Sequence, residues 1–118
     1  MNEDLVSLEV AKLLKENGFD CLCQAFYNTN GILAVSPVHT VNDELEDSDI
    51  ACPTLYMTQK WLREERGIHI VIDFKSKDSW YYRTYDLHEN ELNEQSEEYF
   101  NTYECALQAG ILEALKII

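Results

Sequence analysis

The sequence has few basic residues and no long apolar run. Its 118 residues include 9 Lys and Arg against 22 Asp and Glu, so the formal net charge is −13 at pH 7. Proteins that bind nucleic acid neutralise phosphates with clustered basic side chains, and anionic membrane surfaces attract the same side chains. No apolar run approaches the roughly 20 residues that a membrane-spanning helix needs. Direct binding to nucleic acid or to a membrane is therefore disfavoured.

A secretory signal is missing too. Residues 1–4 are acidic where a signal peptide is basic, and polar residues interrupt the apolar stretch at residues 5–14. We therefore expect a cytoplasmic protein.

Motifs for metal, cofactor or nucleophile chemistry are absent as well. The four cysteines, Cys21, Cys23, Cys52 and Cys105, lack the second Cys or His pair that a zinc finger requires. An acidic intracellular domain of this size needs no disulfide framework. Gly-rich phosphate loops, His-Glu-x-x-His and Gly-x-Ser-x-Gly do not occur. We expect reduced, mostly buried thiols, no metal and no cofactor.

The apolar content that is present suffices for one folded domain. The chain is 46% apolar and holds 2 Trp, 7 Tyr and 4 Phe, which is enough material for a core. Its length suits a single domain over residues 1–118.

Three helices are predicted from apolar spacing and end signals. Ser7 is a suitable N-cap for a helix over residues 8–17, which ends before Gly18. A second helix opens at residues 53–54 and stops at Gly67, and a third runs over residues 102–118 with Thr102 as its cap. Gly110 interrupts the apolar stripe of the third helix, which indicates a close approach to another element.

Two hairpins are predicted between these helices. The first joins residues 19–27 to residues 32–35 through a turn near Asn30-Gly31. The second joins residues 68–74, the clearest alternating strand, to the aromatic residues 80–87.

Two acidic segments are predicted as exposed loops because they have no apolar period. Residues 36–51 hold five acidic residues between Asp43 and Asp49, and residues 88–98 hold five between Glu89 and Glu98. The second loop is expected to end in a short strand at residues 99–100.

These elements predict an α+β fold with two layers. The two hairpins would pair into one antiparallel sheet of about four strands, with the three helices covering one face, in the order α-β-β-α-β-β-α. Because α-β-β occurs twice, a duplication is suggested by topology alone.

The aromatic strand is the main candidate for binding. Trp80, Tyr81, Tyr82 and Tyr85 alternate between the two faces of the sheet, so helices on one face leave some rings partly exposed. Exposed aromatic rings anchor protein partners, although ordinary cross-strand packing or a homodimer interface also accounts for them. Trp61 is a second candidate anchor, beside the alternative that it belongs to the core.

His69 and Asp73 share one face of the predicted strand, as an acid/base pair would require. No nucleophile or third group accompanies them, so a structural, hydrogen-bonded His69 is favoured over catalysis.

Three segments together resemble small uncharacterised proteins encoded by bacteriophages and by prophage-like or mobile elements in bacterial genomes. They are residues 7–20 (SLEVAKLLKENGFD), 53–72 (PTLYMTQKWLREERGIHIVI) and 99–118 (YFNTYECALQAGILEALKII). Leu55-Tyr56 and Cys105 depart from the pattern, which would have Gln and Glu there. The family has no assigned activity, so the resemblance implies genomic context only.

The sequence therefore predicts a non-enzymatic accessory protein of phage or mobile-element type. Its expected role is to bind a protein, either an unknown partner or a second copy of itself. The alternative hypothesis is an acidic nucleic-acid mimic that blocks a host DNA-binding or defence protein. An enzyme ranks third because no catalytic constellation is recognisable.

Overall fold

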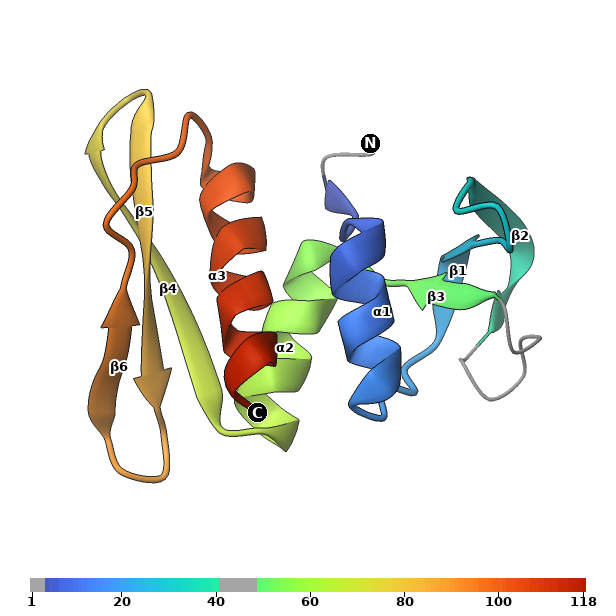
Figure 1. The fold of residues 1–118 in the computed structure, drawn as a ribbon, viewed down its shortest axis with the longest axis horizontal. Helices are drawn as coiled ribbons and strands as arrows, with labels where there is room; N and C mark the ends of the chain where they lie inside the picture. Colours follow the sequence, from blue (N-terminus) through green and yellow to red (C-terminus); the bar gives the residue numbers. More distant parts are fainter. Residues whose placement is uncertain (1–3, 41–48) are drawn as a thin grey trace. The chain divides into compact units, whose positions relative to one another are not determined.

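The chain forms two compact units, each with its own three-stranded antiparallel sheet (Figure 1). The computed structural model describes residues 4–40 and 49–118. The units comprise Met1–Thr54 and Leu55–Ile118, and each is described by itself. The α+β class is confirmed, whereas the single domain over residues 1–118 stays a prediction.

The first unit begins with α1, Leu8–Glu16. The Oγ atom of Ser7 accepts a hydrogen bond from the backbone N–H of Val10 at 3.3 Å, so the predicted N-cap is confirmed. Val10 and Leu14 are fully buried on one side of this helix. Asn17 follows as the C-cap, and the predicted end before Gly18 is also correct.

The sheet of this unit has the strand order β2-β1-β3. Its strands are β1 (Cys23–Tyr27), β2 (Leu33–Thr40) and β3 (Ile50–Cys52). The predicted first hairpin is confirmed, with an Asn28 side chain that accepts hydrogen bonds from two backbone N–H groups of the turn. The first strand begins later than predicted, and Phe19 is buried in the segment before it.

The predicted loop over residues 36–51 is wrong at both ends. Residues 36–40 continue β2, and residues 50–51 belong to β3, which pairs with the free side of β1. Strand pairing supplies backbone hydrogen bonds there without an apolar alternation in the sequence. The acidic residues Asp43, Glu44, Glu46 and Asp47 lie outside the described residues.

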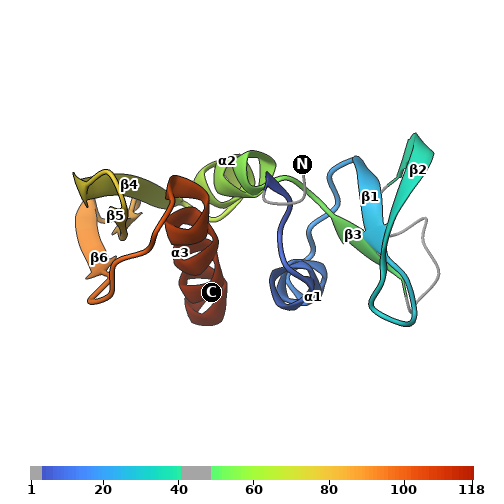
Figure 2. The same ribbon diagram turned by 90° about the horizontal axis from the view of Figure 1, so that it is seen from above.

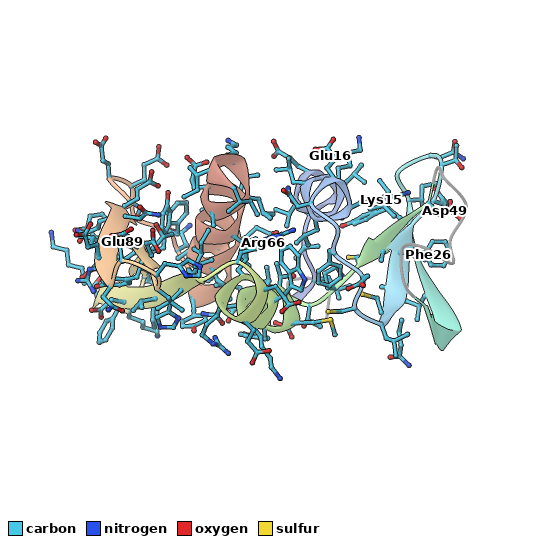
Figure 3. The ribbon with its side chains drawn as sticks, turned by 90° about the horizontal axis from the view of Figure 1, so that it is seen from below. Lys15, Glu16, Phe26, Asp49, Arg66 and Glu89 are labelled. Atoms are coloured by element: carbon cyan, nitrogen blue, oxygen red, sulfur yellow. The ribbon has the colours of Figure 1, made fainter. Side chains whose placement is uncertain are left out.

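Backbone contacts join the two ends of the first unit. The N–H of Val6 donates to the carbonyl of Pro53 at 3.1 Å, and Leu5 forms an isolated bridge with Thr54. In Figure 3, Lys15 points toward Asp49, whose backbone carbonyl accepts a 2.9 Å hydrogen bond from the Lys15 Nζ atom. Asp49, the residue directly before β3, is thereby tied to α1.

The second unit has the strand order β4-β5-β6. Its elements are α2 (Leu55–Glu65), β4 (Ile68–Ser76), β5 (Ser79–Asp86), β6 (Glu91–Gln95) and α3 (Tyr103–Ile117). The second hairpin and both helices are confirmed. The loop predicted over residues 88–98 is wrong, because its central part is β6 and pairs with β5. The expected short strand at residues 99–100 is an isolated bridge between Phe100 and Trp80.

The single four-stranded sheet is therefore corrected to two three-stranded sheets. Each hairpin pairs with a third strand from its own acidic segment, β3 beside β1 and β6 beside β5. The element order is α-β-β-β-α-β-β-β-α, not α-β-β-α-β-β-α. The central strand of the first sheet is β1, the first strand of its unit, whereas the central strand of the second sheet is β5, the second strand of its unit. The suggested duplication therefore does not extend to strand order.

In the second unit, α3 lies against one face of β4 and β5 (Figure 2). A Cβ atom added to Gly110 would lie 3.1 Å from Ile70 Cγ2 and 3.1 Å from Tyr82 Cγ, so the predicted close approach is confirmed. The helix can pack this tightly on the sheet because Gly has no side chain. On the edge of β4, the Nε2 atom of Gln59 in α2 donates to the carbonyl of Ile70 at 2.9 Å.

Candidate functional site

Alternation along β5 sorts its aromatic residues onto the two faces of the second sheet. Tyr82 packs under Gly110 of α3, and Trp80 makes an edge contact with Tyr103 of the same helix. Tyr81 and Tyr85 point the other way. We name the face turned away from α3 the outer face, and it carries His69, Val71, Asp73, Tyr81, Arg83, Tyr85, Leu92, Gln95 and Tyr99.

Arg83 is the centre of the outer face. Its Nη2 atom donates to the Tyr81 hydroxyl at 2.8 Å, and its Nε atom donates to Gln95 Oε1 at 3.1 Å. Its Nη1 atom lies 3.6 Å from Asp73 Oδ2, an ion pair that is partly exposed and therefore weak. The guanidinium also lies 5.1 Å from the centre of the Tyr81 ring. These contacts hold one cationic group in a defined position on the sheet.

Tyr99 extends this cluster beyond the last strand. Its ring meets that of Tyr81 edge-on, with centroids 5.7 Å apart, and 52% of the residue is exposed. The Nζ atom of Lys75 lies 5.5 Å from the centre of the same ring. The outer face thus combines Tyr, Arg and Lys side chains on a hydrogen-bonded sheet.

The structure brings together two of the five predicted partner-binding residues. Tyr81 and Tyr85 are half-buried on the outer face. Trp80 belongs to the opposite face, where it contacts Phe74 and donates through Nε1 to the carbonyl of Lys77. Trp61 and Tyr82 are only 6% exposed, so little of either ring is available to a partner. Arg66 lies over the Trp61 ring, 5.1 Å from its centre.

Arg83 and Tyr99 are central to the contacts of the outer face but were not singled out from the sequence. Arg83 lies on the same side of β5 as Tyr81 and Tyr85, so the alternation that selected the two rings also marks Arg83. Tyr99 had no comparable signal, because it approaches Tyr81 only through the path of the chain after β6.

His69 and Asp73 do not meet on the outer face. They are four positions apart along β4, a rise of roughly 13 Å. Asp73 instead contacts Arg83, and its Oδ1 atom accepts a hydrogen bond from the N–H of Phe74 at 2.8 Å. The Nδ1 atom of His69 is buried and has no hydrogen-bond partner among residues 4–40 and 49–118, so the predicted hydrogen bond of His69 is not found at this atom. The arrangement does not join the two side chains into an acid/base pair.

An acidic cavity lies on the α3 side of the second sheet, beside β6. Its volume is about 390 Å³, and its lining includes the apolar residues Phe100, Ala109 and Leu112. Four carboxylates surround it, those of Glu94, Glu97, Glu98 and Glu113.

Tyr82 is part of the lining of this cavity. Its hydroxyl donates to Glu94 Oε1 at 3.0 Å. Burial raises the pKa of Tyr82, and the hydrogen bond to Glu94 and the nearby negative charges add to the rise. The hydroxyl therefore stays a neutral donor that holds the Glu94 carboxylate in place.

The cysteines are free thiols in three environments. Cys23 and Cys52 are buried in the first sheet, Cys21 is half-buried and Cys105 is exposed. Burial raises the pKa of Cys23 to about 12 and that of Cys52 to about 11, so both are protonated near neutral pH. Among residues 4–40 and 49–118, no group of three or more His, Cys, Asp or Glu side chains is arranged to hold a metal ion.

No helix within the described parts of the chain is long and apolar enough to cross a membrane. Comparison with known protein families, characterised proteins and solved structures finds no significant match. The two surfaces of the second sheet are therefore the basis for assigning a function.

Proposed function

We propose that this chain is a non-enzymatic accessory protein of phage or mobile-element type that binds another protein. Its working surface is the outer face of the second sheet, and it acts in the cytoplasm. One observation carries the proposal: the partly exposed cluster of Tyr81, Arg83, Tyr85 and Tyr99 on one side of a sheet whose other side is packed against α3.

The residue types of this cluster favour protein binding. Tyr and Arg are enriched among the residues that dominate binding energy at protein interfaces. Arg83 is already oriented by its contacts with Tyr81 and Gln95, so a partner would not have to order it. The exposed ring of Tyr99 adds apolar area beside that charge. The partner is either a different protein or a second copy of this chain.

The experiment measures solution mass and captures partners from a host lysate. Arg83→Ala and Tyr99→Ala are expected to dissociate a dimer or to lose a partner that the wild-type protein captures, by about tenfold or more. Tyr56→Ala is the matched control, because Tyr56 is 46% exposed and lies on α2. A monomer without partners, or capture that is indifferent to Arg83→Ala and Tyr99→Ala, contradicts the proposal.

A second candidate function is acidic mimicry of nucleic acid that blocks a host DNA-binding or defence protein. The observation that favours it is the gathering of Glu94, Glu97, Glu98 and Glu113 around one cavity. Clustered carboxylates compete with phosphates for a basic surface. The test measures whether the protein releases DNA from a host DNA-binding protein or reduces defence activity. Undiminished DNA binding and defence activity exclude this function.

A further inference from the structure

The edge of the second sheet is open along β6. The strand order ends at β6, so the outward N–H and C=O groups of Glu91–Gln95 have no strand partner within the described chain. All five residues of the strand are exposed. By contrast, the other edge of the sheet, β4, receives the Gln59 side chain from α2. An unpaired edge is a template for an added strand.

The negative charge of this edge indicates which kind of strand can pair with it. Glu91 and Glu94 lie on β6 itself, and the turn before it carries Glu89, which Figure 3 labels at this end of the second sheet. Two copies pairing through β6 would bring these carboxylates together, and like charges across a strand pair destabilise it. A segment rich in Lys or Arg would instead place opposite charges across the strand pair, which stabilises it. The edge therefore resists self-pairing and suits a basic strand.

The acidic cavity lies where alternate side chains of an added strand would point. Glu94 pairs with Thr84, whose side chain is buried on the α3 side of the sheet, so Glu94 points to that side too. Leu92 pairs with Tyr85 and belongs to the outer face, where it is 53% exposed. An added strand alternates in the same way. Its side chains would meet Glu94 and the cavity on one face and Leu92 on the other.

We propose that β6 accepts an extended basic segment of a partner protein as a fourth strand. Every second side chain of the segment is Lys or Arg and reaches the carboxylates of Glu94, Glu97 and Glu98. The aliphatic part of such a side chain packs against Phe100 and Leu112 in the cavity. The intervening side chains are apolar and contact Leu92. The added strand touches the outer face only at Leu92 and makes no use of the cluster of Tyr81, Arg83, Tyr85 and Tyr99, so the inference goes beyond the proposed function and does not depend on it.

A bulge in β6 limits the length of the added pairing. The register between β5 and β6 shifts at Asn93, which is the extra residue between Leu92 and Glu94. Bulges twist an edge and interrupt regular ladders. The interaction therefore depends on charge as well as on backbone hydrogen bonds, and it weakens as salt is raised.

The test uses the full chain and a synthetic octapeptide of alternating Lys and Val, blocked at both ends. We expect saturable binding by calorimetry, with amide NMR shifts concentrated at Leu92–Gln95. An octapeptide of alternating Glu and Val tests charge, and the Lys–Val peptide with its four central backbone nitrogens methylated tests strand pairing. Both are expected to bind about tenfold more weakly or not at all. Equal binding of either control peptide overturns the proposal.

Two charge-matched variants locate the site on the protein. The triple substitution Glu94→Gln, Glu97→Gln and Glu98→Gln is expected to weaken Lys–Val binding by about tenfold or more. The control triple substitution Glu16→Gln, Glu64→Gln and Glu65→Gln has the same formal charge, −13 + 3 = −10, and removes exposed acids from α1 and α2. It is expected to change binding less than about twofold. Equal losses in both triples, or shifts away from β6, overturn the proposal.

Discussion

At the residue scale, Gly110 shows why a side chain at one position of α3 would be crowded. The Cβ atom of an alanine there would meet Ile70 and Tyr82 at 3.1 Å, and both residues are buried and have little room to move. The sequence already indicated a close approach at this position. The structure identifies the residues that are approached.

We predict that Gly110→Ala lowers the free energy of unfolding by about 1 kcal/mol, because overpacking outweighs the better helix propensity of Ala. Urea unfolding followed by circular dichroism measures the change. Ala109→Gly, one residue earlier in α3, is the control for propensity and should itself cost about 1 kcal/mol. A Gly110→Ala protein more stable than wild type contradicts the close packing.

The buried thiols of the first sheet predict that the free energy of unfolding depends on pH in the alkaline range. Burial raises the pKa of Cys52 to about 11 in the folded protein, above the ordinary value of 9.0. The unfolded state therefore loses this proton first as the pH rises. The stability that the protonated Cys52 thiol contributes to the folded state is fully present below about pH 9 and is lost as the pH rises toward 11.

We predict that Cys52→Ala removes on the order of 1 kcal/mol of the stability loss seen between pH 8.5 and 10. Urea unfolding at a series of pH values measures it. Cys105→Ala is the control, because Cys105 is exposed, and it should leave the pH profile unchanged. Identical profiles for Cys52→Ala and wild type would show that the thiol does not titrate in this range.

At the element scale, β6 is a strand that the pattern of its side chains does not predict. Its five residues, Glu91–Gln95, are all exposed, so no buried face imposes an alternation. Backbone pairing with β5 holds it instead, and the side chain of Ser96 forms hydrogen bonds just after its last residue. The Ser96 Oγ atom accepts from the N–H of Tyr82 at 3.2 Å and donates to the carbonyl of Glu98 at 3.1 Å.

We predict that Ser96→Ala lowers stability by about 1 kcal/mol and speeds hydrogen exchange in β6 more than in β4. Exchange followed by NMR or mass spectrometry measures the local effect. Ser76→Ala, at the exposed end of β4, is the matched control and should change neither quantity appreciably. Unchanged exchange in β6 would mean that backbone pairing with β5 alone holds the strand.

The helices and hairpins were predictable because their signals are local. Ser7 and Thr102 act as N-caps, and the turn after Tyr27 and the alternation at residues 68–74 each depend on nearby residues only. Of the candidate surface, alternation was enough to place Tyr81 and Tyr85 on one face. The contact of Tyr99 with Tyr81 was not predictable, because it depends on where the chain runs after β6.

At the scale of the whole molecule, the charge of −13 is a source of self-repulsion. We predict that adding NaCl up to about 0.5 M at pH 7 raises the urea midpoint, because salt screens exposed like charges. Near the isoelectric point, about pH 4.4, the same salt should have a much smaller effect. A midpoint at pH 7 that does not respond to salt would contradict self-repulsion as a significant term.

The sequence by itself determined the α+β class, the three helices, the two hairpins and the sign of the charge, because caps, alternation and composition are properties of neighbouring residues. Only the tertiary structure decided that β3 and β6 are strands and that each completes a separate sheet. The acidic segments that contain them carry no apolar period. β6 has no buried face and is specified by its pairing partner, whereas the buried part of β3, Ala51 and Cys52, is too short to show an alternation. The open edge of β6 and the cavity beside it follow from that pairing.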